Sequence, residues 1–345
     1  MEHPAFASLS ANSNTQRKDS ALKNIVLGID ISKKTFDVAL LTDDKVYNKA
    51  FHNNEQGFNA LSAWLNKQGI CNLAACLEST GIYGEPLAEY LHGEGHQVYI
   101  VNPVRIHNYA KSKQLRAKND KLDAKLIAEY CRLHNDLRPF TPAPAEIKHL
   151  QQLERRITDL KDTLIREKNR LEAASRQDRV RASIQRTIRF IEAEIAALES
   201  DIDDTISKNP ELSKNKELLE SSKGVGPVTS RMFLIEFGSF KTFNSARAAA
   251  AYAGITPFTR KSGSSLANPG SISRMGNRRI RQILYMAAQA AAKYNPVFKA
   301  QYDKLRAAGK AYKVAICAIA RRLVHTAYGI IKYQRPFDET LFSIE

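Results

Sequence analysis

Several features are scarce or absent in this sequence of 345 residues. No run of about 20 consecutive apolar residues, the length that spans a membrane, is present. Residues 1–23 are polar and rich in serine and asparagine, and they lack the apolar core of a secretory signal, so we expect a disordered tail. The four cysteines form no CxxC pair and no zinc-binding spacing. Together these absences favour a cytoplasmic protein with reduced thiols.

Acidic residues are also few relative to basic ones. Asp and Glu total 36 against 52 Lys and Arg, a formal net charge of +16. This excess favours a polyanionic partner, because each neutralised phosphate releases condensed counterions. A soluble protein that is merely basic is the alternative, since charge alone is weak evidence. The chain length suits two or three domains.

The first segment, residues 24–145, predicts a mixed α/β domain. The expected elements, in order, are strands at 24–31, 35–42 and 45–53, a helix at 55–67, a strand at 73–77, a helix at 85–91, a strand at 97–101 and a helix at 119–135. A meander of three strands followed by alternating helices and strands indicates a sheet with antiparallel and parallel parts. This is the element order of the ribonuclease-H-like fold.

The second segment, residues 146–215, predicts a helical arm. Apolar residues recur at steps of three and four between 147 and 171 and again between 184 and 206, with a break near 174–181. This spacing is typical of a coiled-coil seam. Dimerisation or RNA contact is one interpretation of the arm, and an internal helical hairpin is the other.

The third segment, residues 216–345, is expected to be helical and basic. A Gly-x-Gly turn between two helices resembles a helix-hairpin-helix element, whose exposed amides can hold a DNA phosphate, although a plain turn is the alternative. A glycine- and serine-rich loop follows at 261–276, with basic residues at its end. The nucleic-acid contacts predicted in this segment are Lys223, Gly224, Gly226, Arg274, Arg278 and Arg279.

Four acidic residues stand out in the first segment. Asp30 and Glu78 each end an apolar strand, where α/β folds place ligands, but each can also be a turn or capping residue. Asp120 and Asp123, three residues apart, share one helix face, where their charges repel unless a cation lies between them. Mg²⁺ prefers such hard oxygen ligands, although Asp120 can instead stabilise the first turn of its helix. Nearby basic residues, Lys118 and Lys121 among them, suit a backbone-binding surface or an ordinary solvated helix face.

Ser262 lies in the glycine- and serine-rich loop, between basic residues. A serine in such a loop is usually part of a turn. To act as a nucleophile it needs a neighbouring base or a metal, and no histidine lies close in sequence. Ser264 and Ser265 are equally available. Chemistry alone therefore does not select Ser262.

The chain resembles the insertion-sequence one-hundred-ten family of transposases, which includes the pilin-gene-inverting recombinases. The similar stretches span almost everything after the first twenty-odd residues, in the family's order: GIDISKKTFDVAL (28–40), CLESTGIYGEPLAEYL (76–91), KNDKLDAKLIAEY (118–130), SSKGVGPVTS (221–230), AAYAGITP (250–257) and KSGSS (261–265). Residues 1–23 lie outside the resemblance.

The resemblance implies a RuvC-like, ribonuclease-H-type domain, a coiled-coil arm and a mostly helical C-terminal transposase domain. It places an Asp-Glu-Asp-Asp metal site on Asp30, Glu78, Asp120 and Asp123, and the catalytic serine on Ser262. It further implies Mg²⁺-assisted recombination of double-stranded DNA through a covalent phosphoserine. Several members use a non-coding bridge RNA that pairs with donor and target DNA. The implied assembly is a tetramer of two dimers, in which sites from two subunits combine.

We therefore expect a site-specific DNA recombinase of an insertion sequence, acting at the bacterial nucleoid. A junction-resolving nuclease could use the same acids to activate water. A sugar kinase or ATPase of a related fold is suggested by GIDIS and ESTG, but the positive charge and the Asp120/Asp123 pair argue against it. Four intact acids and a serine argue against a scaffold that only binds nucleic acid.

Overall fold

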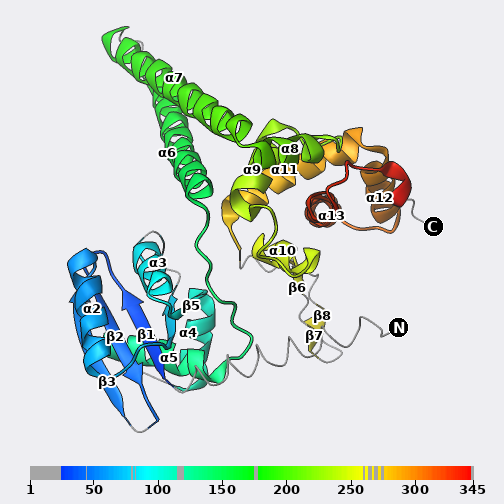
Figure 1. Ribbon diagram of the computed structural model, residues 1–345. Coiled ribbons are helices and arrows are strands. Elements are labelled where there is room, and N and C mark those ends of the chain that lie inside the picture. Colours follow the sequence, from blue (N-terminus) through cyan, green and yellow to red (C-terminus); the bar gives the residue numbers. More distant parts are fainter. Residues whose placement is uncertain are drawn as a thin grey trace, which may run out of the picture. The chain divides into compact units, whose positions relative to one another are not determined.

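A computed structural model describes residues 25–43, 45–78, 81, 83–114, 120–174, 178–258, 261–262, 266–267, 271–272 and 276–342, with the backbone alone for some of them, including Asp120, Lys121 and Ser262. The expected disordered tail lies outside these residues. The chain divides into two compact units, Met1–Pro142 and Ala143–Glu345, each with its own hydrophobic core (Figure 1).

The N-terminal unit is built on a five-stranded mixed sheet of order β3-β2-β1-β4-β5. The first three strands form an antiparallel meander, while β4 pairs with β1 and β5 pairs with β4 in parallel. This arrangement confirms the prediction of a sheet with antiparallel and parallel parts. The strands are β1 (Val26–Ile31), β2 (Thr35–Leu41), β3 (Val46–His52), β4 (Ala74–Glu78) and β5 (Gln97–Val101).

Two layers of helices cover this sheet, and the two apolar clusters of the unit lie on opposite faces of it. One face packs against α2 (Glu55–Lys67) and α3 (Glu85–Gly93), and the other against α4 (Pro103–Ser112) and α5 (Asp120–Leu133) (Figure 1). Alternation along each strand sends neighbouring side chains to opposite layers. The position of a residue along its strand therefore determines which of the two helix layers its side chain faces.

Helix α4 is an element that the sequence analysis does not anticipate. The predicted strand at 97–101 is followed directly by this helix, which begins at Pro103. The Asn102 side chain accepts a hydrogen bond from the Val104 amide, and Pro103 occupies the first helical position, where its missing N–H costs nothing.

Helix α5 packs closely against the sheet at Gly28 of β1. A Cβ atom at Gly28 would lie 2.1 Å from the Ala124 carbonyl oxygen and 2.4 Å from the Ala128 amide nitrogen. Such distances are far inside van der Waals contact, so only glycine fits here. Ala124 and Ala128, both buried, complete a contact of small residues that brings helix and strand together.

In the second unit, α6 (Ala145–Ala173) and α7 (Asp178–Lys208) form a helical hairpin. Ion pairs between Lys161 and Glu199 at 2.7 Å and between Lys168 and Glu192 at 2.8 Å show that the helices run antiparallel. The two helices and the break between them are confirmed, and they form a hairpin within one chain. Dimerisation or RNA contact of the arm stays a prediction. The seam residues Ile147, Leu150, Ile157, Leu160, Ile191, Ile195, Ile202 and Ile206 are buried as expected.

The arm shares one hydrophobic core with the helices that follow it, and both lie in the unit Ala143–Glu345, within which the division at 215/216 stays a prediction. These helices are α8 (Pro210–Glu220), α9 (Pro227–Phe237), α10 (Ala246–Tyr252), α11 (Arg278–Tyr294), α12 (Pro296–Ala307) and α13 (Tyr312–Tyr333). Within the described residues, α13 alone is long and apolar enough to cross a membrane. Its Ile316, Ile319 and Leu323 lie in the shared core, as in a buried helix of a globular unit.

We predict that Gly28→Ala destabilises the N-terminal unit, because the added methyl group overlaps the α5 backbone. Overpacking of this kind costs about 1–3 kcal/mol. Urea unfolding followed by circular dichroism measures the change. In the control Gly93→Ala, the new Cβ has no neighbour within 4 Å, and stability should hold or rise by up to about 1 kcal/mol. Equal effects of the two substitutions would contradict the packing described here.

Candidate functional site

Asp30 and Glu78 lie side by side on adjacent strands. The parallel register of β1 and β4 pairs Ile29 with Leu77, and Asp30 and Glu78 are the next residues of the two strands. Ile29 and Leu77 face the α2 and α3 layer, so alternation directs both acids to the face that α5 covers. Both side chains are partly buried.

A third acid, Asp37, joins them and was missed by the sequence analysis. The antiparallel register pairs Asp37 of β2 directly with Asp30. Its neighbours Phe36 and Val38 belong to the cluster on the opposite face, so Asp37 also lies on the α5 face. The expected strand at 35–42 and its alternation already place Asp37 on one face of the sheet. The strand register, which sets Asp37 opposite Asp30, does not follow from the sequence.

The predicted helix pair lies on α5, the helix that crosses this face. Asp123 is partly buried and precedes the buried Ile127 by four residues, so it shares the sheet-facing side of the helix. Asp120 begins α5, and its side chain lies outside the described residues. Carboxylates of three strands and one helix thus lie on one layer of the unit.

This donor set suits a hard divalent cation such as Mg²⁺, which takes carboxylate oxygens and keeps several waters. Among the described side chains, no group of three or more His, Cys, Asp and Glu lies close enough to hold a metal ion. The Asp120 side chain is not among these described side chains. Asp30 and Glu78 are the two carboxylates that strand register places side by side, and with Asp123 alone they do not complete a metal site among the described side chains.

Much of the basic stretch beside α5 is occupied by ion pairs within the unit. Arg105 binds Asp136 at 2.7 Å, which holds the pKa of that carboxyl below its usual value. Lys113 binds Glu129, whose hydrogen bond raises the pKa of the lysine. Lys118 and the side chain of Lys121 lie outside the described residues, so their predicted contacts with nucleic acid stay predictions.

Ser262 occupies a short hairpin in the second unit. Strands β7 (Lys261–Ser262) and β8 (Leu266–Ala267) are antiparallel, and Ser262 pairs with Leu266. Strands β6 (Pro257–Phe258) and β9 (Ser271–Ile272) pair outside them. The expected glycine- and serine-rich loop therefore takes part in two antiparallel ladders, and Ser262 is the last residue of β7. The Ser262 side chain lies outside the described residues.

The base of this hairpin, which we define as Gly276 and Asn277 after β9, contacts three helices. A Cβ atom at Gly276 would lie 2.3 Å from the Tyr252 carbonyl oxygen, so the chain passes directly against the end of α10. Arg281 donates a hydrogen bond to the Gly276 carbonyl at 2.6 Å. Asn277 caps α11 and donates to Glu236 of α9 at 3.4 Å. Burial raises the pKa of Glu236.

A cavity of about 410 Å³ opens beside the base of the hairpin. Its polar wall comes from α11, while the β9 residue Ile272 lines another side. The predicted contact Arg278 is exposed and belongs to this wall, together with Arg281, Gln282 and Tyr285. Guanidinium, amide and aromatic groups in one cavity can accommodate a sugar-phosphate backbone.

Arg279, also predicted to contact nucleic acid, is instead bonded within the unit. Its guanidinium binds the carboxylate of Glu154 on α6 and donates to the Glu154 carbonyl at 2.9 Å. The same carboxylate lies 3.8 Å from Arg231 of α9. Glu154 and Arg231 are both buried. Geometry therefore favours a structural role for Arg279, which ties the arm to the start of α11.

The Gly-x-Gly turn joins α8 to α9 as expected, and its residues divide into two groups. Gly224 has a φ of +101°, and a Cβ there would lie 2.5 Å from Ala291 Cα, so this glycine packs against α11. Lys223 and Gly226 are exposed, and Gly226 begins α9 without a side-chain cap. Exposed amides at a helix start can receive a phosphate, so Lys223 and Gly226 remain the candidates of this turn.

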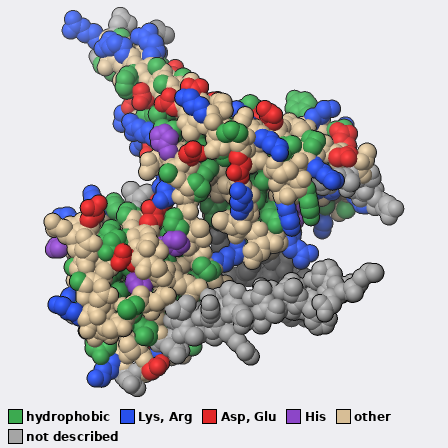
Figure 2. Space-filling model, in the orientation of Figure 1, with side chains coloured by type: hydrophobic (Ala, Val, Ile, Leu, Met, Phe, Trp, Pro, Cys, Tyr) green, Lys and Arg blue, Asp and Glu red, His purple; other side chains and the backbone are tan. Residues whose placement is uncertain are grey.

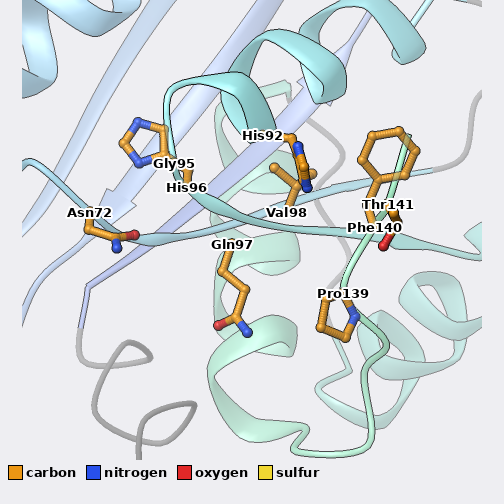
Figure 3. A pocket seen from close by; sticks show the side chains of 9 residues that line it. All are labelled: Asn72, His92, Gly95, His96, Gln97, Val98, Pro139, Phe140 and Thr141. Carbon is orange, nitrogen blue, oxygen red and sulfur yellow. The ribbon is translucent and has the colours of Figure 1, made fainter. Parts of the chain in front are cut away.

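Two other surface features lie apart from these residues. Lys and Arg gather at the outer end of the arm, where Arg179, Arg186 and Arg189 are exposed (Figure 2). A cavity of about 310 Å³ lies beside β5, with His96 and Gln97 projecting from opposite sides of the backbone (Figure 3). Burial lowers the pKa of His96, and no carboxylate lines this cavity.

Comparison with known proteins identifies the family. Residues 27–177 match a family model described as a transposase, of the DEDD type in the IS110 group, and residues 216–303 match one described as "Transposase IS116/IS110/IS902 family". The pilin gene-inverting proteins of Moraxella lacunata and Moraxella bovis are each 35% identical over 319 residues, which covers 91% of this chain and 98% of theirs. The chain belongs to the IS110 family of transposases.

Two further similarities are weaker. An uncharacterized 43.6 kDa protein of insertion element IS110 from Streptomyces coelicolor is 28% identical over 58% of this chain and 46% of its own length. RuvC of T. thermophilus, solved in complex with a Holliday junction substrate, aligns with 34% of this chain and 99% of its own, at 11% identity and a TM-score of 0.27. At that score the likeness supports no argument about fold.

We predict that Glu154→Gln strongly destabilises the second unit, because it leaves the Arg279 guanidinium without a carboxylate and leaves the buried Arg231 with only Glu199, at 3.5 Å, among the described residues. Loss of one partner of a buried pair costs about 3–5 kcal/mol. Urea unfolding gives the change in free energy. The control Glu172→Gln removes an exposed carboxylate from the same helix and should shift stability by no more than about 0.5 kcal/mol. Equal stability of the two variants would show that the ion pairs do not hold the arm.

Proposed function

We propose that this transposase is a site-specific DNA recombinase that cuts and rejoins DNA through a covalent phosphoserine at Ser262. A divalent metal on Asp30, Glu78, Asp120 and Asp123 would assist the reaction. The observation that carries the proposal is the register of β1 and β4, which aligns Asp30 with Glu78 on the face crossed by α5. The aligned acids match the motif positions that the family resemblance indicates.

The proposed fold of the N-terminal unit is ribonuclease-H-like and, more narrowly, RuvC-like. The strand order β3-β2-β1-β4-β5 supports it, since an antiparallel meander continues into two parallel strands. The placement of the acids supports it further, because they occupy the central strands and the helix that covers them. A divalent metal bound there would stabilise negative charge that develops on a phosphodiester.

In the proposed reaction, the Ser262 hydroxyl oxygen attacks a backbone phosphorus and a serine phosphoester forms. The bond from phosphorus to the leaving strand oxygen breaks, the serine gives up its proton, and the leaving oxygen gains one. The ester conserves the energy of the broken bond, so a hydroxyl of another strand can reverse the step without an external energy source.

Nucleic-acid contacts are proposed at three places in the second unit. Arg278 in the cavity at the base of the hairpin and Lys223 with Gly226 at the start of α9 would bind phosphates. The exposed arginines at the outer end of the arm suit contact with RNA or DNA. Arg274, which lies outside the described residues, stays a prediction of the same kind.

Guidance by a bridge RNA and assembly as a dimer of dimers are also proposed, and they rest on the family resemblance. The positive charge of the chain is compatible with an RNA partner as well as a DNA partner. In the proposed assembly, acids of one subunit combine with the serine of another. DNA as the substrate would place the protein at the nucleoid.

A second candidate function is cleavage of DNA junctions with water as the nucleophile. It is favoured by one observation, that the acids converge within the N-terminal unit and use no residue of the second unit. On this alternative Ser262 has no chemical role.

We predict that Ser262→Ala abolishes the covalent protein–DNA adduct and recombination, because the phosphoester has no oxygen on which to form. A plasmid that carries the element with its flanking sequences serves as substrate, and denaturing gels reveal the adduct. Ser264→Ala and Ser265→Ala are matched controls and should retain both activities. Strand cleavage by Ser262→Ala at the unaltered rate would instead support the nuclease.

A further inference from the structure

A second cavity of the C-terminal unit, of about 530 Å³, has the composition of a binding site. It lies between α8, the loop after α9 and the end of α13, and it shares no lining residue with the cavity beside the Ser262 hairpin. The residues that matter for its chemistry are Asn215, Lys241, Phe243, Tyr328, Lys332 and Gln334.

One wall of this cavity is aromatic. The Tyr328 hydroxyl donates to the Phe243 carbonyl at 3.3 Å, which fixes the two residues against each other. Behind them, Phe240 is buried and contacts the Tyr328 ring edge-on, with 5.8 Å between the ring centroids. Tyr328 and Phe243 are only partly buried, so they offer surface to a planar ring.

A buried hydrogen-bond donor lies in the cavity lining. Gln334 Nε2 donates to the Ile331 carbonyl at 3.0 Å and to Asn215 Oδ1 at 2.9 Å. These two bonds fix the orientation of both amides, because a carbonyl acceptor requires the nitrogen of Gln334. Asn215 Nδ2 is therefore left as a donor, and it has no hydrogen-bond partner among the described residues, although Asn215 is 1% exposed. Such a donor is costly unless a ligand or an ordered water supplies an acceptor.

Backbone strain is concentrated at the same place. Three non-glycine residues in the described part of the chain have a positive φ, and two of them, Phe240 at 53° and Gln334 at 51°, line this cavity. L-residues adopt this conformation at a cost, and such strain clusters at ligand sites.

The rim of the cavity carries one uncompensated positive charge. Lys241 pairs with Glu211 at 3.1 Å, so these two charges largely cancel. Lys332 lies 5.5 Å from the centre of the Tyr328 ring and forms no ion pair with any described residue. An anion next to the aromatic wall would meet this ammonium group.

We propose that this cavity binds one unpaired nucleotide of a nucleic-acid strand. The base lies against Tyr328 and Phe243, an acceptor atom on its edge receives the Asn215 amide, and a flanking phosphate meets Lys332. Base–aromatic stacking combined with a cationic contact to the backbone is how single strands are held without a duplex. A planar ring, an acceptor and an anion occur together in a nucleotide, and the net charge of +16 favours this occupant over a protein segment.

The test is photocrosslinking of the full chain to a short single-stranded DNA that contains one 5-iodouracil. Mass spectrometry of the digested adduct should locate the crosslink on Tyr328 or Phe243. Lys332→Gln and Gln334→Gly should each weaken binding of this oligonucleotide about threefold to tenfold, as measured by fluorescence anisotropy, and reduce the crosslink. Glycine tolerates the left-handed backbone at position 334, so the second variant removes the side chain without new strain.

The matched control is Lys299→Gln, which removes the same charge from an exposed position on α12. It should leave the crosslink in place and the affinity within about twofold. Crosslinks confined to other residues, or unaltered binding by both cavity variants, would overturn the proposal and leave a protein segment as the occupant.

This inference rests on the proposed function only in requiring that a nucleic-acid strand reach the second unit. Ser262→Ala separates the two, since binding in the cavity needs no strand cleavage and the crosslink should persist in that variant. A crosslink without any covalent phosphoserine in the unaltered chain would therefore contradict the proposed reaction and support the cavity.

Discussion

The close packing of α5 against β1 is the constraint on which the account of the N-terminal unit depends. Gly28 has no side chain, and Ala124 and Ala128 have small ones, so the helix backbone comes directly against the strand. The acids at the ends of β1 and β4 then lie on the face that this helix crosses, and Asp123 follows from the same packing. A larger residue at Gly28 would separate the helix from the strand acids without touching a carboxylate.

A comparable constraint organises the second unit. The Glu154 carboxylate binds the guanidinium of Arg279 in the first turn of α11, the helix that follows β9 in the chain. The arm is therefore bonded to the element that carries the hairpin base. Three contacts hold the chain just before α11: Asn277 bonds to α9, Gly276 packs against the end of α10, and Arg281 of α11 donates to the Gly276 carbonyl.

The periodic elements could be predicted from the sequence, because an element that buries one face has apolar residues at regular intervals, and these intervals can be counted along the chain. The strands of the mixed sheet, the helix at 55–67 and the buried seam of the arm are of this kind. Asp37 could not be assigned, since its relation to Asp30 depends on strand register. Arg279 was predicted to contact nucleic acid because its partner could not be predicted either: Glu154 lies 125 residues away in the sequence. Local sequence shows a positive charge but not the carboxylate that neutralises it.

The hairpin that carries Ser262 shows the same limit. Glycine and serine predict a turn locally, whereas the ladders of β6 with β9 and of β7 with β8 come from pairing across the loop. Ser262 differs from Ser264 and Ser265 by family resemblance and not by its own composition. The four predicted acids differ from Ser262, because geometry supports three of them. Strand register places Asp30 and Glu78 on the α5 face of the sheet, and helix periodicity places Asp123 on the side of α5 that faces it.

The central claim is that the acids on the α5 face hold a divalent metal, and binding of Mn²⁺ to the purified chain tests it most directly. Electron paramagnetic resonance of free Mn²⁺ gives the affinity, and excess Mg²⁺ should displace the bound ion. A metal site at these acids predicts that Asp30→Asn and Glu78→Gln each weaken Mn²⁺ binding at least about tenfold, whereas Glu94→Gln, which alters an exposed acid of the same unit, has no effect. Equal Mn²⁺ affinity in all of these variants would contradict it.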